Sequence, residues 1–154
     1  MKGAGLIIEP ARVEHVERWA LMRAALWPDA PIDDHRQEIL ALLRDASDEM
    51  LALIAFDDRR EAVGFAEATI RHDYVNGCDT SPVAFLEGIY VEPCARRAGV
   101  AQALAEAVAR WGAARGCAEL ASDADLANHA SHAFHHAIGF TETERVVYFR
   151  KLIG

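Results

Sequence analysis

The segment from residue 85 to residue 101 constrains the fold of this chain more than any other; it reads Phe-Leu-Glu-Gly-Ile-Tyr-Val-Glu-Pro-Cys-Ala-Arg-Arg-Ala-Gly-Val-Ala. Its first half is apolar and predicts a buried strand, and its last residues begin the pattern of an amphipathic helix. The turn between them carries Arg96, Gly99 and Ala101. Such a turn directs several backbone N–H groups into one small volume, and the helix N-terminus adds partial positive charge. The segment therefore predicts a site for a phosphate group.

Length and composition limit the class of protein. The chain has 154 residues, about half of them apolar, and we expect one domain spanning residues 1–154 around a hydrophobic core. No stretch approaches about 18 uninterrupted apolar residues, and the apolar N-terminal run is too short for a signal peptide, so we expect a cytoplasmic protein with no membrane partner. The formal net charge of −8 argues against nucleic acid as a partner, because its phosphates would be repelled.

Cysteine and histidine patterns disfavour disulfides and metal sites. The cysteines are odd in number and widely spaced, at Cys78, Cys94 and Cys117. This spacing predicts free thiols in or near the core. One predicted helix also holds a group of histidines, namely His129, His132, His135 and His136. The first three do not share one tight face, and no cysteine or carboxylate partner is evident nearby, so we expect no metal site.

The rest of the chain alternates between strand and helix patterns. Strands are expected at residues 6–9, 50–56, 61–72, 84–91 and 117–122, with one or two further strand segments within 143–152. Helices are expected at residues 14–26, from 33 or 34 to 44, at 100–114 and at 128–137. The order predicts an α/β sandwich around a mixed sheet. Gly88, inside a predicted strand, indicates a β-bulge or the close approach of another chain or ligand.

The phosphate turn does not match the common nucleotide-binding loops. A Walker loop needs Gly-Lys-Ser or Gly-Lys-Thr, and neither follows Gly99. A dinucleotide fingerprint needs three glycines early in a β-α-β unit, whereas this turn comes after four predicted strands and meets only one glycine position.

The sequence Arg-Arg-Ala-Gly-Val-Ala at residues 96–101 instead resembles the Arg/Gln-x-x-Gly-x-Gly/Ala turn of the GCN5-related N-acetyltransferases, the GNAT superfamily. A second signal is Asn128, followed by a short helix and by Phe-His-His-Ala-Ile-Gly-Phe at 134–140, where the family has Leu-Tyr-x-x-x-Gly-Phe. The strand order also agrees over nearly the whole chain. The resemblance implies the GNAT fold, a mixed and mostly antiparallel central sheet flanked by helices on both faces.

Longer matches narrow the resemblance to the aminoglycoside 6′-N-acetyltransferases. The specific ones are Ile-Arg-His-Asp-Tyr-Val-Asn-Gly-Cys-Asp at 70–79 and Phe-Leu-Glu-Gly-Ile-Tyr-Val at 85–91, and short pieces at 26–28, 121–123 and 143–146 add weight together. The resemblance implies acetyl-CoA as the donor and the 6′-amine of an aminoglycoside antibiotic as the acceptor, with resistance as the consequence. Some members are dimers whose pocket includes the neighbour's residues near the Tyr74 loop, which implies a homodimer.

The resemblance also assigns residues to the two substrates. For coenzyme A it implies strand-like pairing of the pantetheine with the backbone of Ile89, Tyr90 and Val91. It implies that the amides of Arg97, Ala98, Gly99, Val100 and Ala101 hold the pyrophosphate. Arg96 and Asn128 are also assigned to the coenzyme A site. The positions that match the antibiotic pocket are Trp27, Tyr74, Glu87, Asp123 and Glu144.

Each acceptor residue also has a structural reading. Glu87 interrupts an apolar strand, where a carboxylate is costly unless it is paired or hydrated, and an ion pair with an arginine at the core edge is the alternative. Asp123 could cap a turn or helix, and Glu144 could lie on a solvated strand face. Trp27 and Tyr74 could be packing residues, although aromatic faces also suit aminosugar rings. Together the carboxylates suit a polycationic acceptor.

Two residues are candidates for acid–base catalysis. Direct attack of an amine on a thioester requires the amine to lose a proton and the thiolate to leave, but requires no enzyme nucleophile. Water linked to Glu87 could take the amine proton. His135 stands where many relatives have a tyrosine that protonates the thiolate, and it could donate a proton near neutral pH or be inert or auxiliary.

Two other functions remain open from the sequence. One is a GNAT enzyme that acetylates another polyamine, a small metabolite amine or a protein N-terminus. The other is a non-catalytic, acyl-CoA-binding regulatory domain, which would keep the turn at 96–101 but would need no acidic acceptor pocket. The three candidate carboxylates favour an enzyme.

Overall fold

The computed structural model describes residues 5–154, and within them the strands form one sheet in the order β1-β2-β3-β4-β5. The strands are β1 (Ile7–Pro10), β2 (Met50–Phe56), β3 (Ala62–Arg71), β4 (Val83–Val91) and β5 (Leu120–Ala121). The first four pair antiparallel, and β5 pairs with β4 in parallel. The first four residues, part of the run in which we expect no signal peptide, lie outside the described residues.

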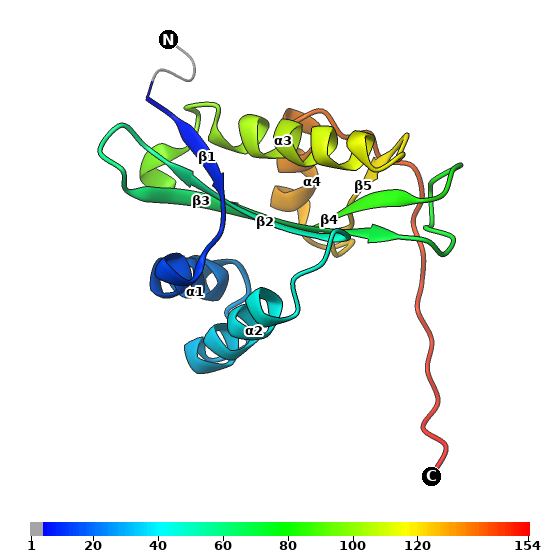
Figure 1. Cartoon of the computed structure of the whole chain (residues 1–154). Coiled ribbons are helices and arrows are strands. Elements are labelled where there is room, and N and C mark those ends of the chain that lie inside the picture. Colours follow the sequence, from blue (N-terminus) through cyan, green and yellow to red (C-terminus); the bar gives the residue numbers. More distant parts are fainter. Residues whose placement is uncertain (1–4) are drawn as a thin grey trace.

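Helices cover both faces of this sheet (Figure 1). On one face lie α1 (Val16–Leu26) and α2 (Ile32–Arg44), and on the other lie α3 (Val100–Ala114) and α4 (His129–Ala137). Helix α1 begins later than expected because residues 13–15 form a short 3-10 helix, and α2 begins one residue before the predicted Asp33. The expected mixed sheet with flanking helices is confirmed.

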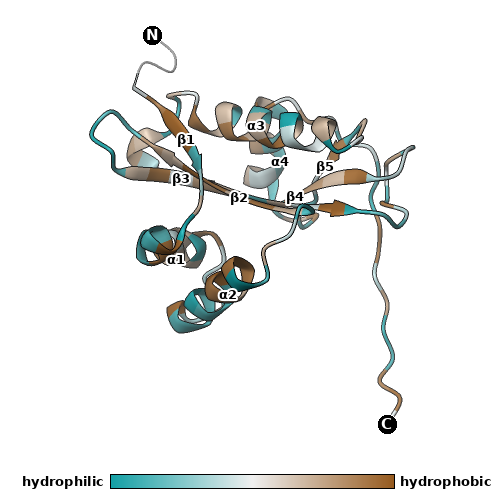
Figure 2. Cartoon of the chain, in the orientation of Figure 1, coloured by the Kyte–Doolittle hydropathy of each residue, from teal (hydrophilic) through white to brown (hydrophobic). Residues whose placement is uncertain are grey.

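The sheet separates two apolar cores, and its strands are mostly apolar (Figure 2). On the α3 side, Leu104 and Val108 pack with Leu86 and other residues of the sheet. On the other side, Trp19 of α1 and Phe65 of β3 are fully buried. Burial of each large apolar side chain stabilises the fold by about 1.5–3 kcal/mol. Both faces of the central strands are covered, which explains why their sequences read as nearly continuous apolar runs.

A β-bulge in β4 places Glu87 outside the core. Glu67 of β3 lies opposite Gly88, whereas Ala68 lies opposite Leu86, so Glu87 is the extra residue. The bulge interrupts the alternation of faces, so Leu86 and Ile89 both pack on the α3 side while Gly88 faces Trp27, at the end of α1. A Cβ at Gly88 would lie 2.5 Å from two carbons of the Trp27 ring. The predicted bulge is confirmed, whereas the group that closely approaches Gly88 is a side chain of this chain and not another chain or a ligand.

The C-terminal segment corrects one prediction. Residues 141–154 form no strand, although strand segments were expected within 143–152. The segment runs away from the body of the molecule (Figure 1), and Phe149 and Ile153 are 92% and 93% exposed. A strand needs a partner for its backbone N–H and C=O groups, and none of the described strands pairs with this segment. Strand β5 is likewise shorter than the expected 117–122.

Two further observations concern sequence expectations. No helix among residues 5–154 has both the length and the apolar character needed to cross a membrane. The three cysteines are free thiols; Cys78 and Cys117 are half-buried, but Cys94 is exposed, which corrects its expected place in or near the core.

Candidate active site

A cleft of about 1130 Å³ opens where β4 and β5 separate. Strand β5 pairs with β4 only at Ala84 and Phe85, so beyond them no described strand covers that edge of β4. The cleft is lined by the end of β4, the N-terminus of α3, the segment after β5 and helix α4. It contains most residues expected at coenzyme A: Ile89, Tyr90, Val91, Arg96, Arg97, Gly99, Val100, Ala101 and Asn128. Ala98 of the same turn does not line it.

The turn before α3 presents unpaired amides to this cleft. Arg97 and Gly99 have positive φ angles of 67° and 81°, and Gly99 is the N-cap of α3. Gly99 has no side chain with which to accept a hydrogen bond, so the first amides of α3 remain open to a ligand. Together with the positive end of the helix dipole, these amides give the turn the geometry that favours an anion, as the sequence predicts.

Arg96 joins this turn to the end of β4. Its Nε donates a hydrogen bond to the Val91 carbonyl at 2.9 Å, and its guanidinium lies 5.7 Å from the centre of the Tyr90 ring. Burial, aided by the nearby Glu92 carboxylate, raises the pKa of the Tyr90 phenol, so this side chain is neutral at physiological pH. Arg96 therefore holds strand and turn in one arrangement.

A second cavity of about 480 Å³ lies beside the first. Its walls come from the loop after β3, the segment after β5, α4 and the start of the C-terminal segment. Tyr74 and Glu144 line it, whereas Trp27 and Glu87 line the first cleft and Asp123 lines both. Its lining includes four carboxylates, namely Asp123, Asp125, Glu142 and Glu144, and two arginines, of which Arg145 pairs with Glu142 and Arg71 with Glu87. The five residues expected at the acceptor are thus divided between two adjoining cavities.

The two cavities share a short stretch of wall. Among the described residues, those that line both are Ser122, Asp123, Ala124, Asp125 and His135. A donor in the first cleft and an acceptor in the second would meet at this wall. Sequence reasoning selected Asp123 and His135 but gave no role to Ser122, although Ser122 lies in the matched piece at 121–123.

Glu87 is paired with an arginine and also lines the first cleft. Thr69 Oγ1 donates a hydrogen bond to its carboxylate at 2.6 Å, and Arg71 Nη2 lies 3.0 and 3.1 Å from its two oxygens. The Arg71 guanidinium in turn lies 3.5 Å from the centre of the Phe85 ring. The structural reading of Glu87, an ion pair at the core edge, is therefore correct. Its side chain remains 32% exposed and open to the cleft.

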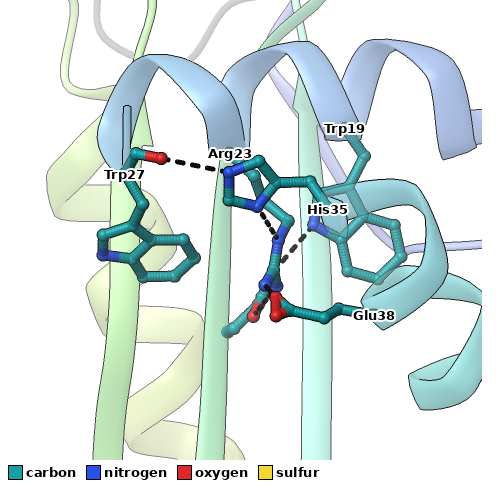
Figure 3. A network of polar contacts seen from close by, with 6 residues as sticks. Trp19, Arg23, Trp27, His35 and Glu38 are labelled. Carbon is teal, nitrogen blue, oxygen red and sulfur yellow. Dashed lines mark hydrogen bonds and ion pairs between the residues drawn. The ribbon is translucent and has the colours of Figure 1, made fainter. Parts of the chain in front are cut away.

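Trp27 is anchored by a polar network that the sequence did not reveal (Figure 3). His35 Nε2 donates to the Trp27 carbonyl at 3.0 Å, and His35 Nδ1 accepts from Arg23 Nε at 3.3 Å. Arg23 Nη1 lies 2.6 Å from both oxygens of Glu67, which also accepts from Trp19 Nε1 at 2.9 Å. Arg23, His35 and Glu67 are buried. The one signal in the sequence was Glu67, a carboxylate inside an apolar strand.

This network fixes one wall of the first cleft. The Trp27 ring packs against Phe65, with ring centres 6.1 Å apart, and covers Gly88 beside Glu87. The Arg23 guanidinium lies 4.9 Å from the centre of the same ring. Trp27 is therefore both a packing residue and a cleft residue, and its position depends on buried charges in α1 and β3.

His135 lies in α4 at the shared wall. Its Nδ1 is 2.7 Å from the Ser131 carbonyl, and its Nε2 is 2.8 Å from Ser122 Oγ. Asn128 caps the same helix, because its side-chain oxygen accepts from the Ser131 amide at 3.1 Å. Among residues 5–154, no group of three or more His, Cys, Asp or Glu side chains is placed to hold a metal ion.

Comparisons with known proteins agree with this architecture. The sequence model of the acetyltransferase (GNAT) family matches residues 14–140. An aminoglycoside N(6′)-acetyltransferase type 1 from Salmonella enteritidis is 50% identical over 137 residues, which are 89% of this chain and 92% of that protein. A protein of the same name from Acinetobacter genomosp. 13 is 50% identical over 96% of this chain and 99% of its own length.

Solved structures give the same result. The aminoglycoside 6′-N-acetyltransferase AAC(6′)-Ih from Acinetobacter baumannii has a TM-score of 0.91 and 49% identity, covering 97% of this chain and 100% of that one. AAC(6′)-Iy, in complex with the bisubstrate analogue CoA-S-monomethyl-acetylneamine, has a TM-score of 0.87 and 47% identity with the same coverage. The chain therefore belongs to the GNAT acetyltransferase family.

Proposed function

We propose that this protein transfers the acetyl group of acetyl-CoA to the 6′-amine of aminoglycoside antibiotics and so confers resistance to them. The observation that supports the proposal is that two cavities meet, one beside the turn at residues 96–101 and one with four carboxylates in its lining. Identity of about half over nearly the whole chain to enzymes of that name supports this choice of acceptor.

Acetyl-CoA occupies the first cleft in this proposal. The amides at residues 97–101 bind the pyrophosphate, and the uncovered edge of β4 at Ile89, Tyr90 and Val91 pairs with the pantetheine. Arg96 and Asn128 hold strand, turn and helix in place around it. The acetyl group then lies at the wall that both cavities share.

The aminoglycoside occupies the acidic side. Asp123 and Glu144 bind its ammonium groups, Glu87 lies at the first cleft, and the aromatic faces of Trp27 and Tyr74 contact its sugar rings. A net charge of −8 attracts a polycation over a longer range. Holding donor and acceptor in line accounts for much of the rate. Water bound to Glu87 takes the proton that the ammonium group loses before attack.

We also propose that two copies form a dimer through their C-terminal segments. Residues 143–152 have a strand pattern but no partner strand in the described chain, and several of their apolar side chains are exposed, among them Val147, Tyr148, Phe149 and Leu152. Strand β5 lies at one edge of the described sheet. Exchange of the segments, each pairing with the sheet edge of the other copy, would bury these side chains and satisfy both backbones.

Light scattering after gel filtration tests the dimer. We expect twice the chain mass for the wild type and a shift toward the monomer for Phe149→Asp. Leu21→Asp, an exposed apolar residue of α1, is the matched control and should leave the mass unchanged. A wild type that runs as a monomer at all concentrations contradicts the proposal.

A thiol-release assay tests the activity. Acetyl-CoA is presented with kanamycin, tobramycin and an analogue that has a hydroxyl in place of the 6′-amine. We expect turnover with the first two alone. If the analogue without the 6′-amine is acetylated as fast as the two antibiotics, the acetyl group does not go to the 6′-amine and this part of the proposal is wrong. No turnover with any aminoglycoside despite tight acetyl-CoA binding favours another amine or a non-catalytic regulatory role.

Free thiols at all three cysteines fit a cytoplasmic protein, which is the compartment we propose.

A further inference from the structure

We propose that Ser122 and His135 form a relay that carries a proton from the attacking amine nitrogen to the sulfur of coenzyme A. This inference rests on the proposed function and assigns Ser122, to which the sequence analysis gave no role, as a catalytic residue. His135 acts through it and not by direct contact with the substrate. Among the described residues that line both cavities, these two are joined by a side-chain hydrogen bond.

The hydrogen bonds fix the direction of the relay. The Ser131 carbonyl oxygen can only accept, so His135 Nδ1, 2.7 Å away, carries a proton and donates it. In the neutral ring Nε2 then has a free lone pair, which accepts the Ser122 hydroxyl proton at 2.8 Å. The other acceptor near that hydroxyl, the Leu86 carbonyl, is farther away at 3.4 Å. The remaining lone pairs of Ser122 Oγ are free to accept a proton from a substrate.

Ser122 also stands at the position that the chemistry requires. It directly follows β5, at the point where β5 no longer pairs with β4, and its hydroxyl is close to Leu86 just before the Glu87 bulge. His135 Nε2 is occupied by Ser122, so a proton from the shared wall reaches the imidazole through the hydroxyl. The helix carbonyl at Ser131 holds the ring in the accepting tautomer.

The proton balance is complete without another reactant. Attack of the neutral amine on the thioester forms a C–N bond and leaves a positive nitrogen and a negative oxygen. The nitrogen passes a proton to Ser122 Oγ while the hydroxyl proton moves to His135 Nε2, so the imidazole becomes positive. When the C–S bond breaks, its electron pair goes to sulfur. The hydroxyl proton then moves to sulfur and Nε2 returns its proton to Oγ, which restores both residues.

Single-turnover kinetics of acetyl transfer to kanamycin test the relay. We expect Ser122→Ala and His135→Gln each to slow the transfer about 100-fold with KM changed less than threefold, within the range typical of acid–base catalysis. The double variant should be no slower than either single one, since both remove the same relay. Ser122→Thr keeps a hydroxyl and should recover most of the rate. Glutamine at 135 can accept a hydrogen bond but cannot take the proton, so it separates proton transfer from packing.

Ser81→Ala is the matched control. The Ser81 hydroxyl donates to the His72 carbonyl at 2.9 Å and lies outside both cavities, so its loss should leave the rate unchanged. A solvent isotope effect that curves with deuterium fraction is expected for the wild type, because two protons move, and should be lost in Ser122→Ala. Additive effects of the two single variants, or a wild-type rate in His135→Gln, overturn the relay.

Nitrogen NMR of His135 gives a test that does not depend on turnover. We expect Nδ1 to be protonated, Nε2 unprotonated in the neutral ring, and the Nε2 signal to move in Ser122→Ala but not in Ser81→Ala. A ring protonated at Nε2 overturns the relay even if the enzyme is active. Absence of wild-type turnover with the expected tautomer present points instead to failure of the proposed acceptor.

Discussion

Arg71 Nη2 lies 3.0 Å from the Glu87 carboxylate, so the charge that interrupts β4 is paired at the rim of the first cleft. The β-bulge makes this contact possible, because it turns Glu87 toward Thr69 and Arg71 while Leu86 and Ile89 stay in the core. A carboxylate that would be costly inside a strand is thereby satisfied and still faces a cavity.

Replacing Glu87 with glutamine should weaken acceptor binding. Glu87→Gln keeps the shape of the side chain but leaves the Arg71 cation unpaired beside a polycationic substrate. We expect KM for aminoglycosides to rise about tenfold, which corresponds to about 1.4 kcal/mol, with a smaller fall in kcat. Steady-state kinetics check this, with Glu49→Gln as control, an exposed carboxylate that pairs with His72 outside both cavities. Complete loss of turnover at unchanged KM would instead identify Glu87 as a dedicated base.

Gly88 and Trp27 should be energetically coupled. A methyl group at residue 88 would lie 2.5 Å from the Trp27 ring, so Gly88→Ala must displace that ring. We expect a loss of about 1–3 kcal/mol in the free energy of unfolding, typical of overpacking, and a higher KM for aminoglycosides. Trp27→Phe in the same chain provides space, so urea denaturation of the double variant should reveal a smaller loss than the sum of the single ones. Strict additivity contradicts the contact.

The buried pair of Arg23 and Glu67 should contribute strongly to stability when one partner is removed. Glu67→Gln leaves the buried Arg23 cation with only the exposed Glu38 carboxylate, 2.5 Å from its Nη2, as a counter-charge, and we expect a loss of about 3 kcal/mol in urea denaturation. Glu9→Gln, which breaks an exposed pair with Arg60, is the control and should cost far less. Equal losses in the two variants would mean that the buried network beside Trp27 stabilises the fold no more than an exposed ion pair does.

Glu119 should make the fold sensitive to acid. Hydrogen bonds from the Thr80 side chain, from the Thr80 amide and from the Asp79 amide hold its pKa below the ordinary value of 4.5. A depressed pKa in the folded state stabilises the fold above about pH 4.5, and this contribution is lost as pH falls through the folded value. Glu119→Gln should therefore be less stable than the wild type at pH 7, with the difference shrinking in acid.

Denaturation midpoints measured across this pH range check the Glu119 prediction. NMR titration of the Glu119 carboxylate gives the folded pKa directly. A difference between wild type and variant that stays constant from neutral to acid pH would show that the hydrogen bonds do not favour the ionised form.

The strand-turn-helix unit could be predicted because its determinants are local. Val100, Leu104 and Val108 follow helical spacing, and Gly99 supplies the positive φ that ends the turn. The C-terminal segment could not be predicted in the same way. Its pattern identifies a strand correctly as a preference, but a strand forms only against a partner, and residues 143–152 have none within the described chain.

The candidate site was predictable only in part. The turn and all five acceptor candidates lie in matched motifs at single segments, whereas no local motif gives the roles of Ser122 and of the network formed by Arg23, His35 and Glu67. The roles of these residues depend on hydrogen-bond partners that lie 12 to 44 residues away along the chain.

The sequence alone was enough to predict the strand, turn and helix from Glu87 to Ala101, because dihedral preferences and hydrophobic spacing act over a few residues. Only the tertiary structure decided that Glu87 is paired with Arg71, that Trp27 covers Gly88, and that Ser122 meets His135 where the two cavities join. Those contacts form because packing brings together segments that are far apart in the sequence. Burial removes competing water, so each polar contact then contributes more to the stability of the fold.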